Sequence, residues 1–318
     1  MRRMLVGFFA IVVLAAIALG SHPAQAAPST AQGLQISPVI IELNADKGQT
    51  YNLKLSVLNV TTGDLVFKSF VNDFKAKDET GNPQVLLTSD LPPSASVISW
   101  VQPIGNIPLA AKQTKTLIVP VTVPANAESG GHYGVIRFSG TAPEEQETSV
   151  SLAASAGVLL LVRVSGQITE NLKISEFFTQ KGSQRTSWFE TGPVTFVERI
   201  SNTGNVHVKP IGDLTVSNMF GKHVATLKVN ETKGNILPAS TRRFEQTLNK
   251  KWMLGKYTAA VNLAYGTQGK VLAGTTTFWV IPYKLIIVIL IVLAVLIFLI
   301  RMLVKRYNRR VIQKAQQK

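Results

Sequence analysis

The chain has 318 residues, of which 46% are hydrophobic, and it carries a formal net charge of +15 without any cysteine. This length allows two globular domains, and the lack of cysteine excludes disulfide bonds, thiol catalysis and thiolate metal sites. The basic charge does not indicate a nucleic-acid partner, because many of the basic residues flank apolar segments of the kind found in membranes.

Residues 1–26 have the order of a secretory signal peptide. Two arginines precede an apolar run over residues 5–19, and the small-residue sequence "AQA" follows it. This order predicts export, with cleavage between Ala26 and Ala27. An uncleaved amino-terminal anchor is the alternative, since the apolar run is long for a signal peptide. In both cases the residues that follow are exported.

The exported body, residues 27–281, reads as all-β. Short alternating or β-branched runs such as "YNLKLSVLN" and "VTFVERISN" are separated by Gly, Asn, Pro and Asp. These runs are typical of strands joined by turns. No stretch of the body keeps the 3.6-residue apolar period of an amphipathic helix.

The two halves of the body resemble each other. Four segments recur in the same order, and they begin at Leu34 and Leu172, Tyr51 and Val194, Leu109 and Leu237, and Gly131 and Gly255. This pattern indicates a tandem duplication of one β domain, and about seven short strands in each half fit a sandwich. We therefore predict two tandem immunoglobulin-like β-sandwich domains, residues 27–166 and 167–281.

Two structural details follow from the duplication. Tyr133 and Tyr257 hold matching positions near the start of a strand, which predicts a tyrosine corner in each domain, where the hydroxyl group bonds back to the chain. The connection near Gly166 is short, so the two domains are expected to stack as a rod.

Residues 282–304 form the predicted membrane helix. No polar residue occurs from Leu285 to Ile300, and a helix over residues 285–304 spans about 30 Å, the thickness of the hydrocarbon core. Residues 305–318 are a short basic tail, and the positive-inside rule places them in the cytoplasm. The protein is thus expected to cross the cell membrane once, with an extracellular or periplasmic body. The residues expected at the membrane interfaces are Trp279, Tyr283, Lys284, Arg301, Lys305 and Arg306.

His132, in "SGGHYGVIRFSG", is the strongest catalytic candidate. Its counterpart in the second half is Lys256, so the position does not require an imidazole. The histidines lack metal-binding spacing, and "AASAG" around Ser155 lacks the first glycine of a nucleophile elbow. We predict no catalytic residue, no metal site and no cofactor, and a hydrolase that uses His132 is the weakest alternative.

Arg185, Trp188 and Phe189 are weak candidates for ligand binding. They lie together in the polar stretch "SQRTSWFETG", a composition found at binding surfaces. The alternative is that one ring covers the end of the sandwich. The acidic stretches "TAPEEQETS" and "NDFKAKDETGNP" lack the spacing of a calcium loop and are predicted to be solvated hairpin tips.

The segments "YNLKLSVLN", "VNDFKAKDETGNPQ" and "TKTLIVPVTVPANAESGGHYGVIRFSG" resemble the peptidoglycan-binding domain of WxL-interacting bacterial surface proteins. The layout of signal peptide, two sandwiches, membrane helix and basic tail is also similar to that family. The resemblance covers the architecture and most of the first domain. It implies a non-enzymatic surface protein that binds cell-wall polymer or other surface proteins, in adhesion or envelope assembly.

The alternative is a chaperone-like or secretion-associated membrane subunit, because pilus chaperones share the sandwich architecture. Such a subunit binds a client strand at an open sheet edge. A long, unpaired and uncharged edge would favour this alternative, whereas lysines or prolines on the edges would not. The sequence leaves the ligand and the oligomeric state open.

Overall fold

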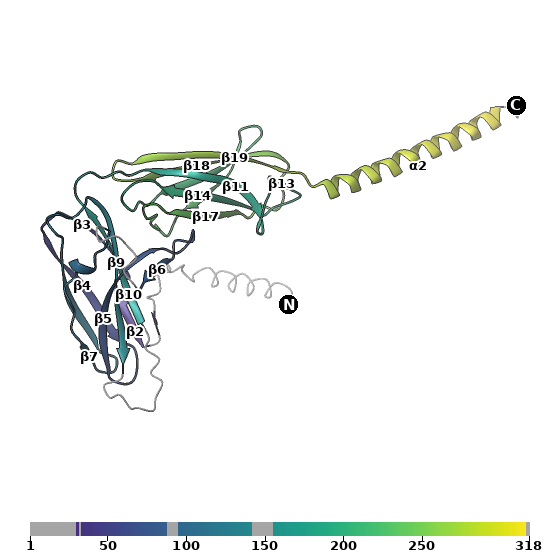
Figure 1. Cartoon of the computed structure of the whole chain (residues 1–318). Coiled ribbons are helices and arrows are strands. Elements are labelled where there is room, and N and C mark those ends of the chain that lie inside the picture. Colours follow the sequence, from purple (N-terminus) through teal and green to yellow (C-terminus); the bar gives the residue numbers. More distant parts are fainter. Residues whose placement is uncertain (1–29, 32, 88–94, 142–154, 316–318) are drawn as a thin grey trace, which may run out of the picture.

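The structure is a computed structural model that describes residues 30–31, 33–87, 95–141 and 155–315. Two β-sandwiches are followed by one long helix, so the predicted fold class, all-β with a carboxy-terminal apolar helix, is confirmed (Figure 1). The predicted signal peptide and its cleavage position between Ala26 and Ala27 lie outside the described residues.

The first sandwich packs two sheets against each other. One sheet has the strand order β1-β2-β4-β8, and the other has the order β3-β10-β9-β5-β6 with β7 also paired to β5. The strands are β1 (Thr30–Ala31), β2 (Leu34–Ser37), β3 (Ile40–Ala45), β4 (Thr50–Asn59), β5 (Leu65–Ala76), β6 (Pro83–Leu86), β7 (Ile107–Leu109), β8 (Thr114–Thr122), β9 (Gly130–Thr141) and β10 (Ser155–Val164), with a 3-10 turn at Ile98–Trp100.

Buried and exposed side chains alternate along the strands of the first sandwich, and the buried ones form its core. In β4 the side chains of Leu53, Leu55 and Val57 are buried, while their neighbours in the strand are at least partly exposed. Successive side chains of a strand point to opposite faces, so one polar-apolar alternation is enough to fix which face packs inward. Phe67 and Phe138 fill the space between the sheets.

The second sandwich repeats this plan with sheets β12-β11-β14-β17 and β13-β19-β18-β15-β16. Its core contains Phe196, Leu214, Val261 and Phe278. The strands are β11 (Leu172–Lys181), β12 (Gln184–Arg185), β13 (Trp188–Phe189), β14 (Val194–Asn202), β15 (Ile211–Asn218), β16 (His223–Val229), β17 (Thr241–Leu248), β18 (Gly255–Tyr265) and β19 (Lys270–Val280).

One buried asparagine holds the same turn in each sandwich. Asn59 ends β4, Asn202 ends β14, and both side chains are almost fully buried. Each amide nitrogen donates to a carbonyl group four residues later and to a distant one, Leu109 O at 3.2 Å or Ile236 O at 2.8 Å. These bonds tie the end of each strand to the turn that follows it and to a segment distant in sequence.

The predicted tyrosine corner is confirmed for Tyr257 and wrong for Tyr133. The Tyr257 hydroxyl group accepts a hydrogen bond from Leu254 N over 3.1 Å, and its ring lies in the core. The Tyr133 ring instead lies on the outer face of its sheet, together with Phe74 and Leu161.

The cause is an offset of one residue between the two copies. Gly130 and Gly255 start β9 and β18 with φ values of 135° and 98°, which favour glycine, so these two residues correspond. His132 therefore matches Tyr257 and points into the core. Its Nε2 lies 2.9 Å from Glu128 O, and its ring packs on Trp100.

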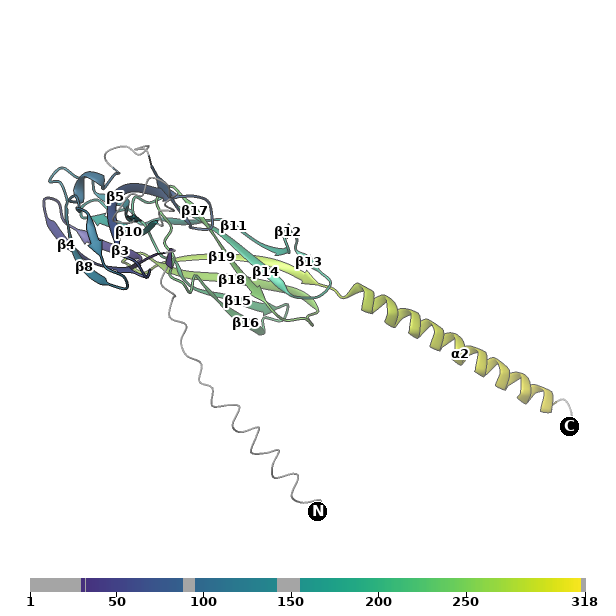
Figure 2. The same ribbon diagram turned by 90° about the horizontal axis from the view of Figure 1, so that it is seen from below.

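Helix α2 (Tyr283–Ala315) follows β19 after only two residues. Its segment Tyr283–Tyr307 is long and apolar enough to cross a membrane and makes no buried contact with the sandwiches. The helix continues past Val304, the end predicted from the sequence, into the basic residues. Figures 1 and 2 both show it leading away from the second sandwich.

The two sandwiches meet at an angle and do not form the predicted rod (Figure 1). The bend arises because the sheet face that carries Phe74, Tyr133 and Leu161 packs against Leu237 of the second sandwich. A short linker limits the distance between two domains but does not set their angle, which the packed surfaces decide.

Candidate functional site

An apolar outer sheet face forms the floor of the candidate site. Phe74, Tyr133, Val135 and Leu161 are buried there, on the side of the sheet that faces away from the core of the first sandwich. A sheet of a sandwich normally turns a polar face to water. An apolar outer face therefore indicates a contact surface, and Leu237 of the second sandwich covers part of it.

Close to the linker, polar contacts join the two sandwiches. Gly131 N donates to Asn205 O over 2.8 Å, and the Tyr133 hydroxyl group lies 3.3 Å from His207 Nδ1. Burial lowers the pKa of His207 to about 4, so its ring is neutral at physiological pH and Nδ1 can accept the hydroxyl proton. The hydrogen bond between Tyr133 and His207 therefore forms between two neutral side chains.

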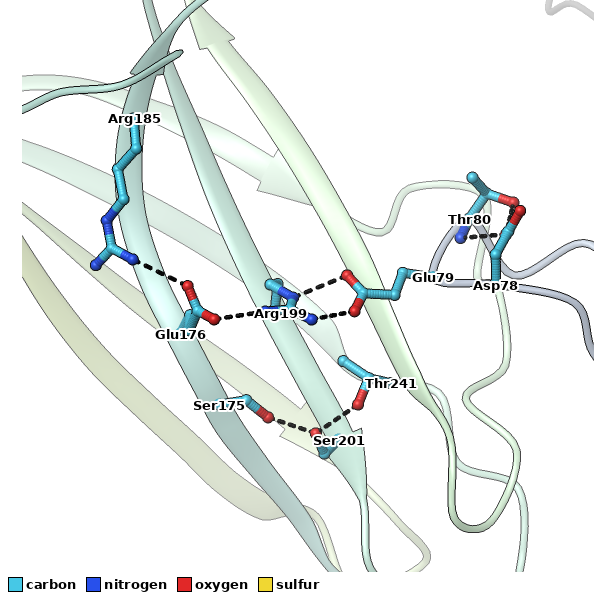
Figure 3. A network of polar contacts seen from close by, with 9 residues as sticks. All are labelled: Asp78, Glu79, Thr80, Ser175, Glu176, Arg185, Arg199, Ser201 and Thr241. Carbon is cyan, nitrogen blue, oxygen red and sulfur yellow. Dashed lines mark hydrogen bonds and ion pairs between the residues drawn. The ribbon is translucent and has the colours of Figure 1, made fainter. Parts of the chain in front are cut away.

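Farther from the linker, the β5–β6 hairpin docks on the second sandwich. Glu79 at its tip forms an ion pair with Arg199 and accepts a backbone hydrogen bond from Arg243 N over 2.7 Å. The hydrogen bonds from Arg199 hold the pKa of Glu79 below its usual range. Figure 3 shows that Arg199 also binds Glu176, which in turn binds Arg185. The predicted solvated tip is thus an interdomain contact.

Between these two connections lies a cleft of about 660 Å³. Ile40, Phe74 and Leu159 contribute apolar side chains from the first sandwich, and residues 232–235 with Arg242 form the opposite wall. This volume lies within the range of about 300–1,000 Å³ that is typical of ligand sites. On one side the cleft is closed by Glu42, which binds Lys209 at 2.6 Å and Asn235 at 2.8 Å.

Strand β3 presents an open edge beside this cleft. It pairs in parallel with β10, and Leu159 N donates to Val39 O over 2.9 Å. Because alternate residues of a parallel strand bond to one neighbour, the backbone groups of Ile40, Glu42 and Asn44 point away from β10. Among the described residues no strand pairs with them, and the Ile40 side chain is 46% exposed.

The neighbouring residues of β10 also lack a paired strand on the side where β3 lies. Residues Ser155–Val158 pair with β9 on one side, whereas β3 begins only opposite Leu159 on the other. No described strand pairs with the other side of Ser155–Val158, although β1 and β2 of the opposite sheet contact β10. An added strand in line with β3 would therefore find unpaired backbone groups there.

Other sheet edges of the described strands carry protecting residues. Strand β8 contains Lys115 and Pro120, while β17 contains two arginines and receives the Glu79 hairpin. Such residues keep a strand edge from pairing with another chain. In β3 the only charge is Glu42, and its carboxylate is already bound by Lys209. The edge of β3, which borders the cleft, is thus less protected than those of β8 and β17.

The predicted ligand-binding candidates lie elsewhere, at the end of the second sandwich next to helix α2. Arg185 binds Glu176 at 3.0 Å, and the exposed Trp188 stacks on Trp279 with ring centroids 5.6 Å apart. Phe189 is only 4% exposed and packs in the core. Phe189 is therefore the ring that covers the sandwich end, and these residues do not line the cleft.

The predicted interface residues flank the apolar part of the helix. Trp279 ends β19, and Tyr283 and Lys284 open helix α2, where Lys284 binds Glu190 at 2.9 Å. Arg301, Lys305 and Arg306 follow the apolar run within the same helix.

The histidines do not form a catalytic arrangement in the described part of the chain. Burial lowers the pKa of His132, whose ring is held in the core, and His223 bonds to Thr226 Oγ1 on the edge strand β16. His207 is partly buried in the interdomain contact. No group of three or more potential metal ligands occurs among the described residues.

No protein-family model matches the chain, and no curated protein matches its sequence. Solved structures that it resembles include the class 5 fimbriae chaperone CfaA, at 15% identity with a TM-score of 0.40 over 76% of this chain and 98% of that one. A second is the SafB chaperone of Salmonella enterica in complex with SafA pilin, at 14% identity and a TM-score of 0.35 over 81% and 99% of the two chains. The E. coli chaperone DraB matches at 14% identity and a TM-score of 0.34 over 77% and 94%.

Sequence reasoning missed the residues that make the cleft. Ile40 lies in "SPVIIEL", where two adjacent isoleucines cannot both point into one core, and this was the available signal. The pairing of Glu79 with Arg199 joins residues 120 positions apart and leaves no local pattern.

Proposed function

We propose that the protein is a membrane-anchored, non-enzymatic binding protein that holds an extended segment of another exported protein in the cleft between its sandwiches. Helix α2 supplies the anchor, with the sandwiches on the outer side and residues 305–318 on the cytoplasmic side. This function is the chaperone-like or secretion-associated alternative, and its partner is a surface or secreted protein.

The open edge of β3 carries the proposal. A client strand that adds to this edge gains backbone hydrogen bonds, which do not depend on its sequence. Its alternate side chains would then face the cleft beside Ile40 and Leu159. The site would therefore prefer extended segments with apolar residues at every second position.

Wall polymer is the second candidate ligand for this cleft, because polar side chains, among them Asn82, Asn235 and Thr241, line it beside the apolar ones. Membership of the WxL-interacting surface proteins, which the sequence pattern suggests, stays a prediction.

The test compares two isoleucines on edge strands. The full chain and its Ile40→Arg and Ile118→Arg variants are purified from membranes of the producing cells, and co-purifying proteins are quantified by mass spectrometry. Ile118 is 59% exposed on β8, away from the cleft, and serves as the matched control. We expect a set of exported proteins that Ile40→Arg loses and Ile118→Arg keeps. Retention of purified wall polymer alone, with no protein that depends on Ile40, would contradict the proposal.

A further inference from the structure

The end of the second sandwich that adjoins helix α2 gathers the exposed tryptophans. The chain has four tryptophans, and Trp100 is buried in the first sandwich. Trp188, Trp252 and Trp279 are 61%, 62% and 36% exposed. Tryptophan rings are amphipathic and concentrate where apolar and aqueous phases meet.

Two connections bring further apolar side chains to the same end. Gly255 pairs with Val280, and Asn218 pairs with Tyr257, so the turn at 219–222 and the connection at 249–254 both lie where β19 meets the helix. Met219, Phe220 and Leu254 occupy these connections and are 54%, 84% and 64% exposed. Side chains of this size are usually buried, and a group of them marks an interaction surface.

The two connections at this end carry positive charge. Lys222, Lys250 and Lys251 are exposed, and Lys251 Nζ lies 5.6 Å from the centre of the Trp252 ring. Residues 218–222 and 249–256 contain no acidic side chain. Lysines next to exposed aromatic rings suit a surface that is apolar beneath and negatively charged above, as an anionic bilayer is.

The connection between this end of the sandwich and helix α2 is too short to let them move apart. Trp279 N donates to Ser187 O over 2.7 Å, and Ile281 N donates to Phe189 O over 2.8 Å, so the strand pairing persists to the residue before Pro282. Helix α2 starts at Tyr283. At about 3.5 Å per extended residue, a helix that spans the bilayer holds this end of the sandwich within the headgroup layer, which extends several ångströms beyond the hydrocarbon core.

We propose that this end of the second sandwich docks on the outer surface of a bilayer that contains anionic lipids. The docking surface consists of the exposed apolar side chains Trp188, Met219, Phe220, Trp252 and Leu254 with the three lysines of the same connections. The proposal rests on the membrane anchorage by helix α2 in the proposed function. Docking fixes the tilt of the second sandwich and with it the height and direction of the cleft above the membrane.

The test measures how deeply Trp252 enters the lipid. The full chain is reconstituted into nanodiscs of zwitterionic and anionic phospholipid, with Trp100, Trp188 and Trp279 replaced by Phe. We expect brominated acyl chains to quench Trp252 and the bilayer to shield it from acrylamide. A matched chain that keeps only Trp100, which is buried in the first sandwich, should show no quenching by brominated lipid and no change in acrylamide quenching when the bilayer is present. In the otherwise natural chain, Trp252→Phe should reduce the lipid-quenched part of the emission, and Trp188 of the same surface should account for part of what remains.

A reporter in the helix separates the two proposals. In a tryptophan-free chain with Leu293→Trp, bromolipid quenching reports insertion of helix α2 alone. If bromolipid quenches the tryptophan at position 293 while Trp252 stays accessible to acrylamide, the docking proposal is wrong and the membrane anchorage by helix α2 is supported. If neither is quenched, the anchorage itself fails.

The lysines give a second readout. A lysine near an anionic surface contributes about 1 kcal/mol, so Lys250→Gln should lower the ratio of docked to undocked molecules about fivefold. Lys228→Gln, on β16 and outside the docking surface, should leave this ratio unchanged. Equal quenching of Trp252 in purely zwitterionic and anionic nanodiscs would contradict the claim that the lysines favour docking on anionic lipids.

Discussion

Glu198 places a carboxyl group inside the core of the second sandwich, and this predicts an unusual dependence of stability on pH. Its side chain is fully buried on β14 between the core residues Phe196 and Ile200. The side-chain amide of Gln246 lies 2.6 Å from one carboxyl oxygen, so the protonated carboxyl group can donate a hydrogen bond to the amide oxygen. Burial raises the pKa of Glu198 from 4.5 to about 8.

The direction in which stability changes with pH depends on whether the folded or the unfolded chain holds the Glu198 proton. Between about pH 4.5 and 8 the folded chain keeps the Glu198 proton and the unfolded chain has released it, so the free energy of unfolding falls as pH rises. At about 1.4 kcal/mol for each pH unit, the full loss is roughly 5 kcal/mol. His207 acts in the opposite direction below pH 6.5, because burial lowers its folded pKa to about 4. From pH 6.5 to 8, Glu198 alone should remove about 2 kcal/mol.

The assay must report on the second sandwich alone. We suggest pulsed hydrogen exchange over a urea series on the detergent-solubilised full chain, read on peptides from β14, at several pH values. Glu198→Gln keeps the shape and removes the titration, so its unfolding free energy should stay level from pH 6.5 to 8. Glu245→Gln, at a half-exposed carboxylate on β17, should leave the natural pH dependence unchanged. Parallel pH profiles for the natural chain and Glu198→Gln would refute the reasoning.

Three other substitutions have definite expected results. Asn202→Ala removes the buried hydrogen bonds to Val206 O and Ile236 O and should cost the second sandwich about 1–3 kcal/mol in urea unfolding, whereas an unchanged unfolding free energy would contradict a stabilising role for these bonds. Gly130→Ala strains a φ of 135° and brings a Cβ within 2.9 Å of Asn205 O, so we expect faster amide exchange at the interdomain contact. Glu79→Gln weakens the ion pair with Arg199 and should broaden the distances between spin labels on the two sandwiches, and an unchanged distribution would contradict a role for this pair.

The sequence predicts well what depends on neighbours along the chain. The alternation of Leu53, Leu55 and Val57 placed one face of β4 in a core, and the structure confirms it. The apolar run after Pro282 likewise forms one long helix. Both patterns rest on the period of a single element, which needs no knowledge of what packs against it.

What the sequence could not predict depends on packing between distant segments. Tyr133 shares its residue type with Tyr257, but the glycine that starts each strand sets which way a side chain points, and the two copies differ there by one position. The bend between the sandwiches depends on contacts of Leu237 with an outer sheet face. The cleft exists only because of that bend, so the adjacent isoleucines indicate that one of them leaves the core but not that Ile40 lines a cleft.

The most direct test of the cleft as a client-binding site is photo-crosslinking in living cells. A benzophenone amino acid is placed at residue 40 on the open edge of β3, or at residue 118 on β8, and the adducts are identified by mass spectrometry. We predict adducts at residue 40 with segments of an exported protein that alternate apolar and polar residues, and none of these at residue 118. Adducts of equal yield and identity at both positions, or no protein adduct at residue 40, would contradict the proposal that the cleft holds an extended client.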